Sequence, residues 1–174
     1  MRLREETEHK PKPMVEIGGR PIVWHIMRHY ARYGFRRFIL CLGYRGDIIR
    51  EYFLNYEYMN SDFTISLAHN RRTLEVHPRL NDPRDDDADW EVTLSDTGQS
   101  TMTCGRIKRI ERYIDTDYFL ATYGDGVSNV NIAAQVDFHK SHGKAATITG
   151  VSPISRFGTL VTEGDEVLDF AEKP

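Results

Sequence analysis

The sequence has few cysteines and no long apolar run. Only two of its 174 residues, Cys41 and Cys104, are cysteines, too few for the disulfide framework of a small secreted domain. No apolar run approaches the ~20 residues of a membrane-spanning helix. The charged start, MRLREETEHKPKP, lacks the apolar segment of a signal peptide. We therefore expect two free thiols, a cytoplasmic location and no membrane partner.

An excess of positive charge is also missing. Lysine and arginine number 23 and aspartate and glutamate 26, which gives a net charge of −3. Nucleic-acid-binding proteins usually carry a surplus of basic residues, so nucleic acid is not an expected partner. The content of 40% hydrophobic and 28% charged residues is ordinary for a globular protein. The length suits one domain with a sizeable core.

Helical and strand patterns alternate along the chain. Helices are expected at 21–33, 47–53, 103–114 and 131–142, with Asp47 capping the second. Strands are expected at 38–42, 63–67, 90–94, 118–122 and 145–151, and a hairpin at 158–170 turns at 163–165. The apolar run 38–42 is typical of a strand buried on both faces.

This alternation predicts an α/β layer structure with a mostly parallel sheet. In such sheets, ligands bind at the carboxyl ends of the strands. The rule selects two places, namely the residues after Leu42 and the residues after Thr122.

Asp125 is the strongest candidate for chemistry. It follows an expected strand and lies between Gly124 and Gly126, which allow a sharp turn and a close approach to a ligand. Mg²⁺ is usually held by one or two carboxylates together with phosphate oxygens and waters. The alternative is a turn aspartate that binds its own loop amides.

A basic stretch lies in the extended N-terminal segment. Arg2, Lys10 and Lys12 are its cations, and prolines at 11 and 13 stiffen the chain around Lys12. A stiff loop can hold a phosphate at little ordering cost. The alternative is a solvated charged tail.

Residues 96–106, DTGQSTMTCGR, are rich in hydroxyl side chains and glycine and precede an expected helix. Loops with free backbone amides suit anions and polar ligands, so Thr101 and Arg106 are candidates to contact a nucleotide. The alternative is an ordinary capped loop.

Two further patterns are less favourable as metal sites. Residues 77–89 are rich in aspartate and proline, but carboxylates crowded in a flexible loop usually repel one another and stay hydrated. His25 and His29 lie four residues apart on an expected helix, without an evident third ligand. We interpret them as histidines on the helix surface.

Taken together, the motifs resemble those of one family. KPKPMVEIGGRPIVWHIM, LCLGYRGDIIREYF, DTGQSTMTCGRIKR, YGDGV and the closing EKP occur in this order in the sequence. The order is similar to that in glucose-1-phosphate cytidylyltransferases, over nearly all of the chain. The resemblance implies a Rossmann-like, three-layer nucleotidyltransferase fold, CTP and glucose 1-phosphate as partners, Mg²⁺ as cofactor and a homo-oligomer.

The resemblance also assigns roles around the phosphates. Arg2 matches an arginine that contacts the triphosphate. Lys12 matches the lysine at the reacting phosphates, and Asp125 matches a Mg²⁺ ligand. Gly124 matches a glycine that contacts substrate beside that ligand.

Three more positions match residues that hold the substrates. Thr101 and Arg106 match residues around the nucleotide, and Lys173 matches the lysine that holds the sugar phosphate. The reacting phosphate oxygen of glucose 1-phosphate is already ionised, so the implied transfer needs no general base.

The chain departs from the family at both ends. The family begins with a strand and a GGxGTR loop, whereas this sequence starts Met1-Arg2-Leu3. The family also continues beyond the EKP motif, into a stretch that supplies a second aspartate. We therefore expect residues 1–174 to form a partial nucleotidyltransferase domain with little or no activity alone. Two alternatives remain: a relative that uses dTTP, UTP or GTP, and a non-catalytic nucleotide-binding remnant.

Overall fold

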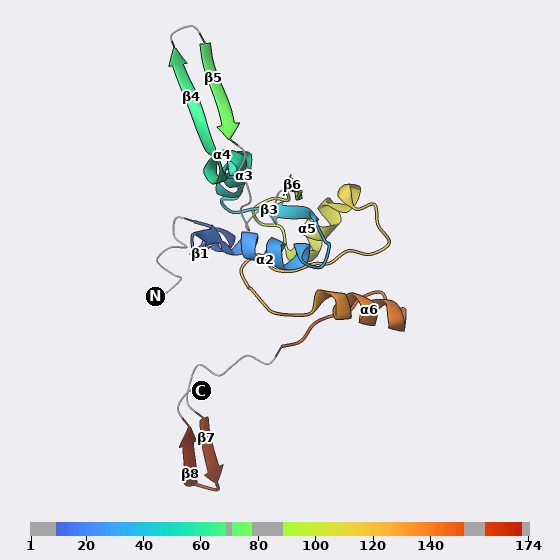
Figure 1. Ribbon diagram of the computed structural model, residues 1–174. Helices are drawn as coiled ribbons and strands as arrows, with labels where there is room; N and C mark the ends of the chain where they lie inside the picture. Colours follow the sequence, from blue (N-terminus) through green and yellow to red (C-terminus); the bar gives the residue numbers. More distant parts are fainter. Residues whose placement is uncertain (1–9, 69–70, 78–88, 152–158, 172–174) are drawn as a thin grey trace. The chain divides into compact units, whose positions relative to one another are not determined.

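The computed structural model describes residues 10–68, 71–77, 89–151 and 159–171 (Figure 1). Contacts divide the chain into two units, Met1–Ile132 and Ala133–Pro174, and each is described by itself. Two predicted site residues, Arg2 and Lys173, lie outside the described residues, as does most of the acidic segment 77–89.

The first unit begins with a short 3-10 turn, a two-stranded ribbon and a helix. These are η1 (Lys12–Met14), β1 (Glu16–Ile17), β2 (Arg20–Pro21) and α2 (Ile22–Ala31). Pro21, with φ −66°, precedes the first turn of α2, where its fixed φ suits helix entry. Gly34 has φ +87° just beyond the helix. The predicted helix and its stop at glycine are therefore confirmed.

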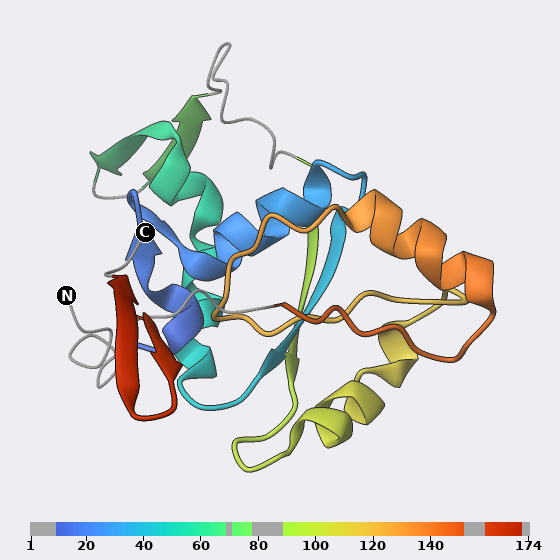
Figure 2. The ribbon, with the colours of Figure 1, turned by 90° about the horizontal axis from the view of Figure 1, so that it is seen from below.

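Two parallel strands form the centre of this unit (Figure 2). β3 (Arg37–Leu42) pairs in parallel with β6 (Glu91–Asp96), with Arg37 opposite Glu91 and Leu42 opposite Asp96. Both strands were predicted. The prediction that β3 is buried on both faces is wrong, because only Leu42 is fully buried. Phe38, Leu40 and Leu42 belong to one hydrophobic cluster, and alternation places the remaining side chains on the opposite, less covered face.

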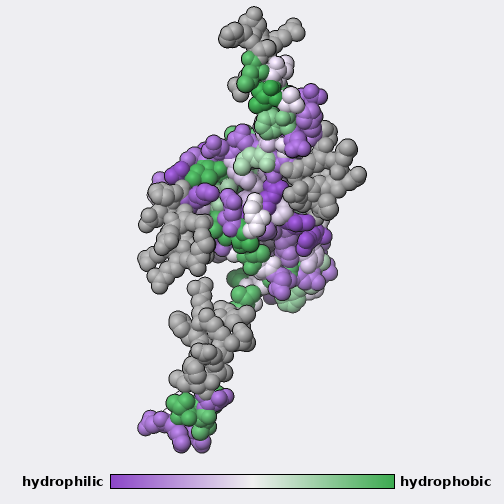
Figure 3. All heavy atoms as spheres, turned by 60° about the vertical axis from the view of Figure 1, so that its left-hand side comes forward, coloured by the Kyte–Doolittle hydropathy of each residue, from purple (hydrophilic) through white to green (hydrophobic). Residues whose placement is uncertain are grey.

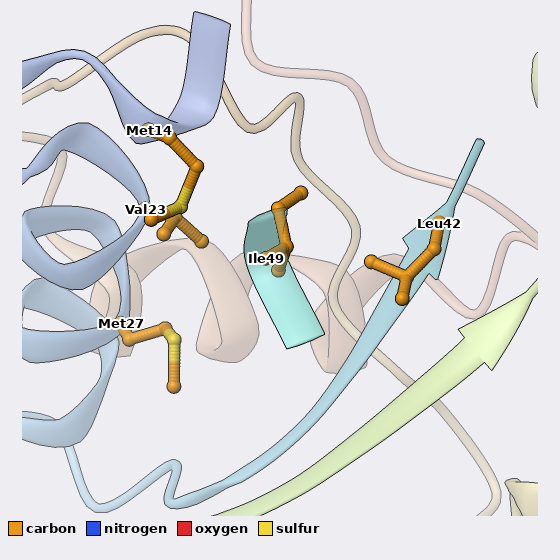
Figure 4. Close-up of a cluster of buried hydrophobic side chains, with 5 residues drawn as sticks. All are labelled: Met14, Val23, Met27, Leu42 and Ile49. Atoms are coloured by element: carbon orange, nitrogen blue, oxygen red, sulfur yellow. The ribbon is translucent and has the colours of Figure 1, made fainter. Parts of the chain in front are cut away.

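The main core joins helices α2 and α3 (Gly46–Leu54) to the end of β3. Met14, Val23, Met27, Leu42 and Ile49 are its buried members (Figure 4). Each large apolar side chain contributes about 1.5–3 kcal/mol when fully buried.

The two tryptophans lie near each other, and one of them packs against this core. Trp24 is buried in α2, and the partly buried Trp90 packs against the cluster. Their ring centroids are 6.2 Å apart.

Helix α3 (Gly46–Leu54) follows β3, as expected, but not with the predicted cap. Its N-cap is Arg45, in the left-handed conformation with φ 50° and ψ 35°, and no side chain caps the helix. Asp47 lies in the first turn instead, with Oδ1 3.4 Å from Arg45 Nε. A carboxylate in the first turn still interacts favourably with the positive end of the helix dipole.

After the short helix α4 (Tyr56–Asn60), two strands form an antiparallel hairpin. β4 (Asp62–Ala68) was predicted, whereas its partner β5 (Arg71–His77) was not. Phe63, Ile65 and Leu67 alternate along β4 and are exposed, Leu67 to 81%. Hydrophobic side chains accordingly lie on the surface of this hairpin, at the top of Figure 3.

The predicted helix after β6 ends early. α5 covers Thr103–Arg109, and a 3-10 turn, η3 (Glu111–Tyr113), replaces its last turn. The predicted strand at 118–122 is wrong, because the described residues supply no hydrogen-bonded partner strand there. Phe119 is 49% exposed, so burial does not hold this segment in a sheet either.

Helix α6 (Ile132–His142) leads into the second unit and confirms the predicted helix. Within that unit, the predicted strand at 145–151 is wrong: it has no strand partner among the described residues, and Ile148 is 92% exposed. β7 (Thr159–Glu163) and β8 (Glu166–Ala171) confirm the predicted hairpin. Gly164 supplies its turn with φ +60°.

The predicted α/β class is confirmed by helices alternating with the parallel β3–β6 pair. The other three strand pairs in the described residues are antiparallel and local. Among the helices in the part of the chain that the structure describes, none is long and apolar enough to cross a membrane.

Candidate functional site

A cavity of about 490 Å³ lies in the first unit, within the ~300–1,000 Å³ range of small-molecule sites. Three segments line it. They are residues 10–13, the turn after β3, and the loop that carries Asp125. The lining residues are Lys10, Pro11, Lys12, Pro13, Tyr44, Tyr123, Gly124 and Asp125.

The Lys12 segment is anchored in the core. Pro11 O accepts a hydrogen bond from Met14 N at 2.8 Å, and Lys12 O accepts one from Val15 N at 3.1 Å. The Met14 and Val15 side chains are buried. The buried side chains and the two hydrogen bonds hold the backbone of the turn in place, while the Lys12 side chain is exposed.

Tyr44 enters the cavity from the turn after β3. The preceding Leu42 is 3% exposed and belongs to the same core cluster as Met14. The Lys12 and Tyr44 segments are therefore both anchored in the same hydrophobic cluster. We call these two segments the packed wall of the cavity.

The other wall is the loop 123–125, which we call the tethered wall. Gly124 lies against Pro13: a Cβ at position 124 would be 3.0 Å from Pro13 Cγ. Gly124 therefore allows a close approach to Pro13, and it is not required for a left-handed turn, since its φ is not positive. A Cβ on Gly126 would meet nothing within 4 Å.

Helix α2 holds both ends of the segment around the tethered wall. His29 Nε2 is 2.7 Å from Val130 O, and Tyr30 forms a side-chain hydrogen bond with Thr122. Burial raises the pKa of Tyr30, and the Thr122 bond partly offsets this. The segment is thus held by side-chain contacts, whereas a strand had been predicted at 118–122.

Lys12 and Asp125, the two central sequence candidates, lie together. Lys12 Nζ is 3.5 Å from Asp125 Oδ2, with the side chains 69% and 41% exposed. An exposed pair of this kind is worth only about 0–1 kcal/mol to folding. The pair therefore contributes little to stability, and both charges are open to a ligand in the cavity.

The donors at Asp125 suit a metal only together with a ligand. Among the described residues, no group of three or more His, Cys, Asp or Glu side chains is placed to hold an ion. Of the described residues that line the cavity, only Asp125 carries a carboxylate. One carboxylate oxygen with phosphate oxygens and waters fits the usual coordination of Mg²⁺, so the residues present fit a cation that arrives with a phosphate ligand.

The histidines of α2 have other partners. His25 Nε2 lies 2.8 Å from Ile17 O, and His29 contacts Val130 O. Each contact engages one ring nitrogen with a backbone carbonyl oxygen.

Thr101 and Arg106 are brought to the carboxyl end of the β3–β6 pair. Arg106 Nη1 donates to Leu42 O at 3.0 Å and to Thr97 Oγ1 at 2.7 Å, and Nη2 donates to Gln99 O at 3.2 Å. Thr101 is half-buried, and its Cγ2 would lie 2.9 Å from a Cβ placed on Gly105. The loop between them is thus tightly packed.

The two cysteines are free. Cys41, in β3, is half-buried, and burial raises the pKa of its thiol, while nearby Arg106 acts in the opposite direction. Cys104 is exposed. A thiol with a raised pKa is a poor nucleophile at neutral pH.

The cavity includes residues that the sequence did not single out as functional. Tyr44 and Tyr123 were not among the candidate residues. The strand-end rule had selected the residues after Leu42 and after Thr122, and both places line the cavity, although 118–122 is not a strand. Thr97 had no sequence signal of its own.

Known proteins resemble this chain over its whole length. A family model described as nucleotidyl transferase matches residues 1–174. The chain is 52% identical over 174 residues to a glucose-1-phosphate cytidylyltransferase of Salmonella typhi and 43% identical over 172 residues to a probable one of Bacillus subtilis. It spans 65% and 64% of these relatives' lengths, and 99% of its own length is covered.

Two crystal structures of HddC from Yersinia pseudotuberculosis, one in complex with GMP-PN, are similar in fold. Their TM-scores are 0.60 and, for the complex, 0.58, each at 23% identity. The match covers 99% and 94% of this chain, and 64% and 60% of those chains.

Proposed function

The chain belongs to the nucleotidyl transferase family, and from this we propose that its cavity takes part in cytidylyl transfer from CTP to glucose 1-phosphate, giving CDP-glucose and pyrophosphate. The observation that carries the proposal is the Lys12–Asp125 pair on the cavity rim. The names of the Salmonella and Bacillus relatives support the choice of CTP and glucose 1-phosphate.

The chemical problem in this reaction is to bring two polyanions together. Two like unit charges ~4 Å apart repel by about 1 kcal/mol in water, and by more at lower effective dielectric. The attacking phosphate oxygen is already ionised, so the site needs cationic groups and positioning in place of a general base. Lys12 would supply a positive charge on a fixed backbone. Asp125, 3.5 Å away, would supply a second one by holding a metal ion.

Lys12 would bind phosphate oxygens near the point of transfer. Its four-carbon side chain is exposed, while its backbone is fixed by the buried Met14 and Val15. Preorganised charge of this kind stabilises developing negative charge without reorganisation during the reaction. When a phosphate ligand enters, Lys12 would exchange its contact with Asp125 for the ligand.

Asp125 would hold a divalent cation, which we propose to be Mg²⁺. When bound, the ion supplies charge neutralisation between the phosphates. Gly124 supports this role, because a Cβ there would lie only 3.0 Å from Pro13 Cγ, and its absence lets the loop lie close to the Lys12 segment.

The other assigned contacts remain predictions. They are Thr101 and Arg106 at the nucleotide, Gly124 at the substrate, and Arg2 and Lys173 at the triphosphate and the sugar phosphate. The cytoplasmic location and a homo-oligomer also remain predictions.

Nucleotide titration tests the binding half of the proposal. Isothermal titration of the chain with CTP, dTTP, UTP and GTP, each with Mg²⁺, should show the tightest binding for CTP. Lys12→Ala should weaken binding at least about tenfold, the effect of one charge-assisted contact. The matched control is Lys140→Ala, a lysine of the second unit outside the lining. If GTP binds most tightly, guanine replaces cytosine as the proposed base. If none of the four nucleotides binds, the proposal is overturned.

A chimera tests turnover. The 174 matching residues of the Salmonella typhi relative would be replaced by this chain, which is 52% identical to them. Pyrophosphate release should then require CTP, glucose 1-phosphate and a divalent cation. A folded chimera that binds CTP and releases no pyrophosphate would favour a non-catalytic binding role.

A further inference from the structure

Thr97 is the most completely enclosed polar residue described in this chain. Its exposed fraction is 0%, and it directly follows the last residue of β6. A buried hydroxyl without partners would cost about 1–3 kcal/mol. Thr97 instead lies at the centre of a hydrogen-bond network at the carboxyl ends of both parallel strands.

The network joins β3, β6 and α5. Thr97 N and Thr97 Oγ1 both donate to Leu42 O, at 2.9 and 2.8 Å. Arg106 Nη1 donates to Thr97 Oγ1 at 2.7 Å and to Leu42 O at 3.0 Å. Arg109 Nη1 donates to Thr97 O at 2.6 Å. The Thr97 hydroxyl is therefore both a donor to the strand and an acceptor for the guanidinium.

Gly43 completes the setting by leaving room for the guanidinium. A Cβ at position 43 would lie 2.5 Å from Arg106 Nη2 and 2.7 Å from Nη1, closer than real carbon contacts allow. The next residue, Tyr44, lines the cavity. The same short turn thus supports the guanidinium of Arg106 and one side of the proposed nucleotide site.

Arg106 keeps donors in reserve. A guanidinium has five N–H groups, and the three contacts to Leu42, Thr97 and Gln99 use three of them. Within the described ranges, Nε and one hydrogen of Nη2 have no protein partner. A cation held rigidly at the carboxyl end of parallel strands, with free donors, is a preorganised contact for an anionic or polar ligand.

We infer that Thr97 is a positioning residue for nucleotide binding, which acts by fixing the guanidinium of Arg106 over Gly43. This inference rests on the proposed function, because it takes the ligand of Arg106 to be the nucleotide. Thr97 itself is fully enclosed, so it acts through Arg106.

Three variants of this chain, titrated with CTP and Mg²⁺, test the inference. Thr97→Val keeps the shape and removes the hydroxyl, and it should weaken CTP binding about tenfold. Thr97→Ser restores the hydroxyl and should bind within about twofold of wild type. Gly43→Ala displaces the guanidinium without touching Thr97 and should reproduce the loss. Circular dichroism melts show that each variant is folded at the titration temperature.

A double-mutant cycle separates positioning from a merely structural effect. In an Arg106→Ala background, Thr97→Val should change CTP binding less than about twofold, since coupled residues are not additive. If Thr97→Val costs the same with and without Arg106, or costs nothing in the wild type, the inference is wrong. If wild type binds none of the four nucleotides, the proposed function fails instead, and melts still report the network.

Discussion

The two walls of the cavity are built in different ways. The packed wall, carrying Lys12 and Tyr44, rests on buried side chains of the main core, among them Met14 and Leu42. The tethered wall, carrying Asp125, belongs to a segment without a strand partner among the described residues and is held by individual contacts from His29 and Tyr30. Burial fixes one side of the site, and a few polar contacts fix the other.

Because of this difference, we expect the packed wall to contribute to folding stability and the tethered wall to contribute to function. Apolar burial dominates folding free energy, so changes beneath the packed wall should unfold the protein. Exposed polar groups contribute little to folding, so a change at Asp125 should affect chemistry alone. Four substitutions can break or sharpen that separation, and the first three have a matched control variant.

Met14→Ala should have the largest effect on stability. Met14 is 6% exposed in the main core, and truncating a buried methionine costs about 2–5 kcal/mol. Urea denaturation should show the loss. The matched control is Met102→Ala, at a methionine that is 81% exposed, which should change the free energy of unfolding by less than about 0.5 kcal/mol. Equal losses at both methionines would contradict the assignment of the packed wall.

Asp125→Asn should leave stability unchanged and reduce turnover. In the Salmonella chimera we expect a loss of at least about 100-fold in kcat, the scale of losing one electrostatic stabiliser. Asp137→Asn, in α6, is the control. A kcat within threefold of wild type, measured by pyrophosphate release at saturating CTP, would remove Asp125 from the metal role.

His29→Ala should weaken the tethered wall by a smaller amount. The contact of His29 with Val130 O is partly buried, and a hydrogen bond of this type contributes about 1 kcal/mol. Hydrogen exchange should show faster exchange of amides in residues 122–131. His25→Ala, which removes an exposed contact on the same helix, should leave those amides unchanged. Equal exchange in both variants would show that His29 is not a tether.

Asp115 should give the smallest effect, and one that depends on pH. Its hydrogen bond from Arg37 at 2.9 Å and the nearby positive charge hold its pKa below the ordinary 3.8. The native state therefore binds this proton less readily than the unfolded state. The contribution to stability is present above pH 3.8 and disappears as the pH falls through and below that value.

The measurement is the thermal midpoint of Asp115→Asn against wild type at several pH values. Because the pair is exposed at the surface, the difference at neutral pH should be small. It should vanish in acid. A difference that grows as the pH falls would contradict a lowered pKa for Asp115 in the native state.

Local patterns in the sequence predicted much of the fold. Pro21 and Gly34 marked the ends of α2, and apolar runs marked β3 and β6. The segments at 118–122 and 145–151 have the same apolar character, yet they are not strands. Sheet formation depends on a partner strand and on burial, which no local pattern records.

The site was predictable to a similar degree. Lys12 was found from the prolines beside it and Asp125 from its flanking glycines, although the strand predicted at 118–122 is not formed. Thr97 was missed, because a single threonine in DTGQST looks like any other hydroxyl residue. Its importance arises from Leu42, Gly43 and Arg106, which come together only in three dimensions.

The placement of the two tryptophans has a practical consequence. Trp24, buried in α2, and Trp90, which packs against the main core, are the only tryptophans in the sequence, and both belong to the first unit. Their intrinsic fluorescence therefore reports loosening around α2 and β6, and is blind to melting of residues 133–174, which contain neither tryptophan nor tyrosine. A fluorescence transition that precedes or follows the far-ultraviolet dichroism transition would reveal independent unfolding of the second unit.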